Sequence, residues 1–145
     1  MTIKNAKDMI EGYADRMLLN ERHDCTVVSM AASLGMSYKA AHDLAKSHGR
    51  RPRQGMDPDR FRELMVTLIQ RGKLNWLPIE RIRTYYKSTD RYRKMKLSTF
   101  CKNNSKGTYI LLVRGHVTTV KDGIVVDGVG QPNQYVKQGW MVMGV

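Results

Sequence analysis

The fold of this chain is decided by residues 107–127, which read GTYILLVRGHVTTVKDGIVVD. Residues 108–113, 116–120 and 124–127 are β-branched and apolar, and each stretch has the length of a strand. Asp122-Gly123, between the second and third stretches, is a pair typical of a two-residue hairpin turn. The segment therefore predicts an antiparallel sheet in the last third of the chain.

Upstream of this sheet, apolar residues recur at helical spacing between turn residues. The pattern predicts helices over residues 6–18, 25–34, 38–48, 57–71 and 97–103, a strand over 74–77, a short helix or an extended segment over 79–87, and a final strand over 140–145. We expect Asp24 and Ser37 to cap the second and third helices, and Gly35 to end the second. The order indicates one α+β domain, residues 1–145, with N-terminal helices (about 6–103) packed on a C-terminal antiparallel sheet (about 108–145).

The composition is that of a basic globular protein. Of the 145 residues, 41% are hydrophobic, which is enough for a buried core. Lysine and arginine total 25 against 13 acidic residues, which gives a net charge of +12. This excess favours a polyanionic partner, either nucleic acid or an acidic protein. Since no apolar run approaches a membrane span and no secretory leader is evident, we expect a cytoplasmic protein without a membrane partner.

The two cysteines, Cys25 and Cys101, are expected to be free thiols in a reducing compartment. Cys25 would stand at the first position of a helix, where the dipole and the free backbone N–H groups favour a thiolate and can hold an oxyanion. No second Cys or His pair stands at zinc spacing, and no glycine-rich phosphate loop occurs. We therefore expect neither a metal nor a cofactor.

The hairpin turn brings a histidine close to an aspartate. Counting back from Asp122-Gly123, His116 lies diagonally opposite Asp127 on the same face of the sheet. An aspartate there would orient the imidazole and set its tautomer, as the third member of a catalytic triad does. Asp122 is the alternative acid, although the turn itself explains its position.

Five blocks of sequence carry a resemblance to a known family: Asp24-Cys25, Gly35-Met36-Ser37-Tyr38, Lys106-Gly107-Thr108-Tyr109-Ile110, Gly115-His116-Val117 and Asp122-Gly123. From about Asn20 to Asp127, the chain resembles small phage-encoded papain-like proteins, which are similar to the bacteriocin-processing cysteine peptidases. The most specific part is the block from Gly107 to Asp127. The resemblance implies a papain-like fold and a viral cysteine peptidase or acyl-transfer hydrolase in the host cytoplasm.

By this resemblance, Cys25 is the nucleophile, His116 the general base and Asp127 the orienting acid. The family usually has a glutamine shortly before the cysteine to complete the oxyanion hole, and the candidate here is Asn20. The thiolate would attack an amide carbonyl of a peptide or protein substrate and form an acyl-enzyme. The first alternative is a non-catalytic relative that uses its basic surface to bind nucleic acid or a host factor.

The second alternative is a DNA-binding regulator, because residues 27–46 also fit a helix-turn-helix. Ala31 supplies a small residue in the first helix and Gly35 stands in the turn. Tyr38 and Lys39 would then begin the recognition helix. The pattern is degenerate, since any two helices joined by a short glycine turn produce it.

Two basic stretches are candidates for contacts with nucleic acid. One is the loop with Arg50, Arg51 and Arg53. The other alternates cations with tyrosines over residues 81–96, and its candidates are Arg81, Arg83, Arg91, Arg93 and Lys94. This mixture suits RNA or single-stranded DNA, because bases stack on rings while cations meet phosphates. The alternative is a solvated face whose tyrosines pack partly on the core.

Overall fold

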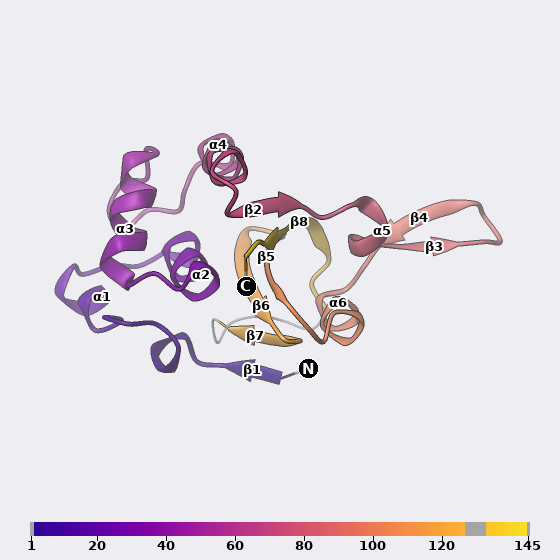
Figure 1. Ribbon diagram of the computed structural model, residues 1–145, viewed down its shortest axis with the longest axis horizontal. Coiled ribbons are helices and arrows are strands. Elements are labelled where there is room, and N and C mark those ends of the chain that lie inside the picture. The colour runs from indigo at the N-terminus through magenta and orange to yellow at the C-terminus, as the bar shows by residue number, and fades with distance from the viewer. Residues whose placement is uncertain (1, 127–132, 145) are drawn as a thin grey trace.

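The computed structural model describes residues 2–126 and 133–144 and shows a mixed α+β fold, which confirms the expected class. In chain order (Figure 1) the elements are β1 (Thr2–Lys4), the 3-10 helix η1 (Ala6–Asp8), α1 (Asp15–Leu18), α2 (Cys25–Leu34), α3 (Tyr38–Ser47), α4 (Pro58–Gln70), β2 (Leu74–Trp76), α5 (Ile79–Ile82), β3 (Arg83–Tyr86), β4 (Arg91–Lys94), α6 (Leu97–Asn103), β5 (Thr108–Val113), β6 (His116–Lys121), β7 (Ile124–Val126) and β8 (Val136–Val142). Among the described residues, no helix has both the length and the apolar character needed to cross a bilayer.

The main sheet has six strands in the order β1-β7-β6-β5-β8-β2. Its core is the antiparallel sheet predicted from the last third of the chain. The sheet differs from the prediction at both edges, because β1 adds in parallel to β7 and β2 adds antiparallel to β8. All three residues of β1 are exposed, so this strand carries no apolar pattern by which it could be recognised.

The turn at Asp122-Gly123 forms as the sequence predicts. Lys121 pairs with Ile124, and both turn residues have positive φ, 50° for Asp122 and 78° for Gly123. A Cβ atom at position 123 would lie 3.1 Å from the carbonyl oxygen of Cys101. Gly123 is therefore required both by its left-handed backbone and by the close approach of α6.

Apolar side chains fill both faces of the sheet. Ile110 of β5 packs in the core that β5 shares with α2, α3 and α4, whereas Leu111 packs in the core on the side of α6. Figure 1 shows α2 and α3 on one side of the strands and α6 on the other. Burial on both faces explains why β5 is apolar without alternation.

Three expected elements differ in the structure. Residues 6–18 form only η1 and α1, because Gly12 takes a left-handed φ of 70° between them. The final strand is β8, which begins at Val136 rather than at residue 140. Residues 79–87 combine both expected states, with α5 followed directly by β3.

Strands β3 and β4 form a two-stranded antiparallel sheet of their own. Figure 1 shows this hairpin projecting beyond α5, away from the helices and the main sheet. Its tyrosines do not pack on the core: Tyr85, Tyr86 and Tyr92 are 48%, 43% and 44% exposed. The basic stretch predicted between residues 81 and 96 is therefore largely a protruding arm.

Candidate active site

Helix α2 is held against β6 by two buried hydrogen bonds. The Ser29 hydroxyl donates to the Val117 carbonyl oxygen at 3.0 Å, and the Thr119 hydroxyl donates to the Ser29 carbonyl oxygen at 2.9 Å. All these groups are buried, so water does not compete for the bonds. They fix the N-terminal half of α2, which begins at Cys25, beside β6, which begins at His116.

Cys25 is the first residue of α2 and is half-buried. Burial alone, the largest influence, would raise the pKa of the Cys25 thiol, but hydrogen bonds from the His116 side chain, the Val117 backbone and the Thr26 side chain lower it. The net pKa lies below that of an ordinary thiol, so the site favours the nucleophilic thiolate. The predicted pair of Cys25 and His116 is thus brought together.

Two cavities meet at this pair. The larger, of about 670 Å³, is lined by Asn5, Tyr13, Arg16, His23, Asp24, Cys25, Val28, Gly55, Gly115 and His116. The smaller, of about 250 Å³, also contains Cys25 and His116, and it extends over apolar side chains that include Met56, Phe61 and Leu112. A substrate could therefore approach the Cys25 thiol through the larger, polar cavity and place one of its side chains in the smaller, apolar cavity.

Asp24 does not cap α2 with its side chain, contrary to expectation. Its carboxylate accepts a bidentate pair from Arg16 at 2.8 and 3.1 Å and a bond from the Tyr38 hydroxyl at 2.7 Å. Burial would raise the pKa of Asp24, but the hydrogen bonds from Arg16 and Tyr38 hold it below its usual value. With the carboxylate engaged elsewhere, the first backbone N–H groups of α2 are left for an oxyanion.

Asn20 lies apart from the cavity residues. It is exposed in the turn after α1, where it takes a φ of 50°. Asn5 and His23 line the cavity instead, and His23 also has a left-handed φ, 51°, two residues before Cys25. Proximity in sequence to Cys25 could have pointed to His23, but Asn5 comes from the N-terminal segment and carries no such signal.

Asp127, the predicted third member of the triad, lies outside the described residues and remains a prediction from the hairpin register. The alternative acid, Asp122, lies at the end of β6 opposite to His116. Its carboxylate accepts a hydrogen bond from the Gly107 backbone N–H at 3.0 Å. This contact supports its assignment as a turn residue.

Three of the predicted nucleic-acid contacts are structural instead. Arg50 is only 4% exposed, and its guanidinium donates to both oxygens of the buried Glu21, at 2.8 and 3.1 Å. Arg81 donates to Asn104 and to the Tyr109 hydroxyl. The guanidinium groups of Arg81 and Arg83, like that of Arg50, thus hold the fold together, and the burial of Arg50 also keeps it from phosphates.

The remaining basic candidates are exposed: Arg51, Arg53, Arg91, Arg93 and Lys94. The backbone N–H of Arg53 donates to Glu21 at 2.7 Å, which fixes the loop while its side chain stays in solvent. The last three residues belong to β4 on the protruding arm.

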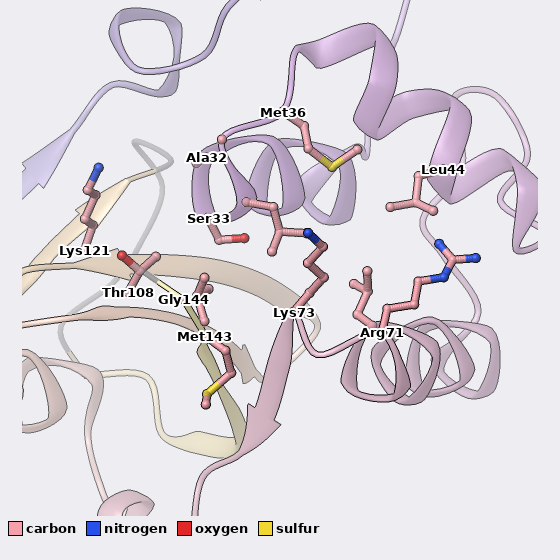
Figure 2. A pocket seen from close by; sticks show the side chains of 14 residues that line it. Ala32, Ser33, Met36, Leu44, Arg71, Lys73, Thr108, Lys121, Met143 and Gly144 are labelled. Carbon is pink, nitrogen blue, oxygen red and sulfur yellow. The ribbon is translucent and has the colours of Figure 1, made fainter.

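A third cavity, of about 550 Å³, lies at the opposite end of α2 (Figure 2). Figure 2 shows Arg71 and Lys73 between α4 and the C-terminal part of α2. The ten residues of α2 put this cavity about 15 Å from Cys25. Its described lining residues include no thiol, imidazole or carboxylate, so it offers no nucleophile or general base.

The predicted recognition helix does not present its first side chain to a duplex. Tyr38 is completely buried and bonded to Asp24, and only Lys39 beside it is exposed. Within the described part of the chain, no three His, Cys, Asp or Glu side chains gather as a metal site would require.

Comparisons with known proteins add no relative. A scan against protein-family models, a search of curated proteins and a search of solved structures each found no match for this chain.

Proposed function

We propose that this protein is a papain-like cysteine hydrolase that cleaves, or transfers the acyl group of, an amide bond in a peptide or protein. One observation carries the proposal: Cys25, at the start of α2, and His116, at the start of β6, line the same two cavities, and the His116 side chain lowers the pKa of the Cys25 thiol. A helix that begins with the nucleophile and packs on an antiparallel sheet bearing the histidine is the arrangement such enzymes use.

The reaction follows from the groups around the sulfur. The Cys25 thiolate attacks the carbonyl carbon, and the first backbone N–H groups of α2 stabilise the resulting oxyanion. Protonated His116 gives its proton to the leaving amine as the C–N bond breaks, which leaves a thioester on Cys25. Neutral His116 then takes a proton from water, and the hydroxide attacks the thioester to release the acid and the thiol. Asp127 is the proposed group that orients His116.

The test is cleavage of a mixed peptide library followed by mass spectrometry. Cys25→Ala and His116→Ala should lower the rate of cleavage at least about 100-fold, since nucleophile and base act as a unit. Cys101→Ala is the matched control, because that thiol lies on α6 and is buried. Cleavage that survives Cys25→Ala, or that is absent from the wild-type protein, would refute the hydrolase.

A helix-turn-helix regulator is not proposed, because the burial of Tyr38 removes the side chain that was to read bases.

A further inference from the structure

We propose that the β3–β4 hairpin is a binding arm for single-stranded nucleic acid, separate from the thiol chemistry at Cys25. Residues 83–94 read RTYYKSTDRYRK, with five basic residues, one acidic residue and no aliphatic side chain. A hairpin of this composition contributes no aliphatic group to a core, and its exposed tyrosines face water.

The arm is anchored at its base by hydrogen bonds from Arg83 to β8. The Arg83 guanidinium donates to the carbonyl oxygens of Val136 and Lys137 at 2.8 and 3.0 Å, which ties β3 to β8. Beyond this point the hairpin contacts the body mainly through α5 and projects into solvent (Figure 1). Arg83 is therefore an anchor, and the rest of the arm is free to meet a ligand.

Each face of the hairpin combines a ring with a cation. Tyr85 and Tyr92 form a cross-strand pair with centroids 5.3 Å apart, on the same face as Lys94. On the other face, the Arg93 guanidinium lies 4.8 Å from the centroid of the Tyr86 ring. Because these rings are more than 40% exposed, a base can stack on them.

The charge of the arm stays strongly positive. Its one carboxylate, Asp90, accepts a hydrogen bond from the Tyr85 hydroxyl near the turn. Arg91, Arg93 and Lys94 are exposed on β4. Exposed cations beside rings that are open to stacking favour a strand whose bases are unpaired, since a duplex keeps its base faces covered.

The experiment measures fluorescence anisotropy of labelled oligothymidine and oligouridine of about 20 nucleotides, and of a duplex of equal length. Both single strands should bind more tightly than the duplex, and the affinity should fall linearly with salt on logarithmic axes. The ratio of the two single-strand affinities then tells whether DNA or RNA is the better ligand. Cys25→Ala should bind like the wild type, which separates this arm from the proposed hydrolase.

Two sets of variants locate the site and remove the same charge. The arm set is Arg91→Gln, Arg93→Gln and Lys94→Gln, and the matched control set, on exposed side chains elsewhere, is Arg22→Gln, Lys46→Gln and Lys102→Gln. The arm set should reduce the salt slope by about 2 and weaken binding, whereas the control set should change it much less. Tyr86→Ala or Tyr92→Ala should weaken binding about 5- to 150-fold, and the phenylalanine variants should retain it.

Three results would overturn the proposal. An equal loss in the arm and control sets would show that only net charge matters. Unchanged affinity after Tyr86→Ala and Tyr92→Ala would show that bases do not stack. Binding of the duplex, or of polyglutamate of similar length, as tightly as the single strands would indicate another polyanion, such as an acidic protein surface.

Discussion

Cys25 and Cys101 are both free thiols, yet their surroundings move their pKa values in opposite directions. Hydrogen bonds from His116, Val117 and Thr26 outweigh burial at Cys25 and lower its pKa. Cys101 on α6 is buried among apolar groups, and burial raises its pKa to about 11. At neutral pH, therefore, a reagent that attacks thiolates should discriminate between them.

Iodoacetamide at pH 7 should alkylate Cys25 at least about ten-fold faster than Cys101, because Cys25 has more thiolate and better access. His116→Ala should raise the pKa of Cys25, so that its labelling slows at pH 7 and recovers at higher pH. Peptide mapping by mass spectrometry gives both rates. The Cys101 rate serves as the internal control, and equal slow labelling of the two thiols would contradict the activated site.

At the level of elements, the loop with Arg50 is fixed to the segment before α2 through a single carboxylate. Glu21 accepts bonds from Arg50, from the Arg53 backbone and from His42. Burial would raise the pKa of Glu21, but these bonds lower it from 4.5 to about 2. The ionised Glu21 is thus part of what stabilises the folded arrangement.

Glu21→Gln should destabilise the protein by about 3–5 kcal/mol at pH 7, since it leaves the buried Arg50 without its charge partner. The pKa of Glu21 is lower in the folded protein than in the unfolded chain. At a pH between these two pKa values, the unfolded chain therefore binds more protons than the folded protein. The contribution of Glu21, about 3 kcal/mol, is complete above pH 4.5 and is lost as the pH falls toward 2. Urea unfolding at several pH values should show the difference between wild type and variant shrinking over this window, and a constant difference would refute the assignment.

Strand β8 passes close to the side chains on the α6 face of the sheet. A Cβ atom at Gly139 would lie 2.7 Å from Leu77 Cδ1 and 2.9 Å from Leu111 Cδ2. Leu111 is completely buried and cannot easily move aside. Position 139 therefore requires glycine for space rather than for backbone freedom.

Gly139→Ala should lower the free energy of unfolding by about 1–3 kcal/mol through overpacking. Gly55→Ala is the matched control, because nothing lies within 4 Å of the added methyl group and φ is not left-handed. Its stability should be unchanged or slightly increased. Thermal unfolding followed by circular dichroism compares the two, and equal midpoints would mean that the core accommodates the methyl group.

On the scale of the whole molecule, the projecting β3–β4 hairpin should contribute little to the stability of the fold. Replacing residues 85–92 by a short glycine turn, with Arg83 kept, should cost less than about 1 kcal/mol, because the removed side chains are exposed. Calorimetry measures the change, and the labelling rate of Cys25 should equal that of the intact chain. A large loss of stability would mean that the arm contributes to folding.

The parts of the fold that follow from local chemistry were predictable. Helix α2 has the expected bounds, because Gly35 takes the left-handed conformation that ends a helix. Ser37 caps α3 by accepting a bond from the Ala40 N–H, and the Asp122-Gly123 turn has the expected register. Each of these depends on residues a few positions apart.

The parts that depend on distant partners were not predictable. Asp24 has the residue type of a cap, but Arg16 and Tyr38, eight and fourteen positions away, take its carboxylate. In the sequence, Arg50 has the pattern of an exposed cation. Only the fold shows that it is buried and paired with the buried Glu21. For the site, the sequence led to Cys25 and His116 and offered His23 through its closeness to Cys25, whereas Asn5 comes to the cavity only through the folded backbone.

The bonds from Ser29 to β6 join residues 88 and 90 positions apart. During synthesis, Cys25 leaves the ribosome long before Val117, and until β6 is made its sulfur lacks the His116 and Val117 groups that lower its pKa. The nascent chain should therefore carry an ordinary, slowly reacting thiol. The reactivity of the Cys25 sulfur therefore indicates the chain length at which the long-range contacts between α2 and β6 form during elongation.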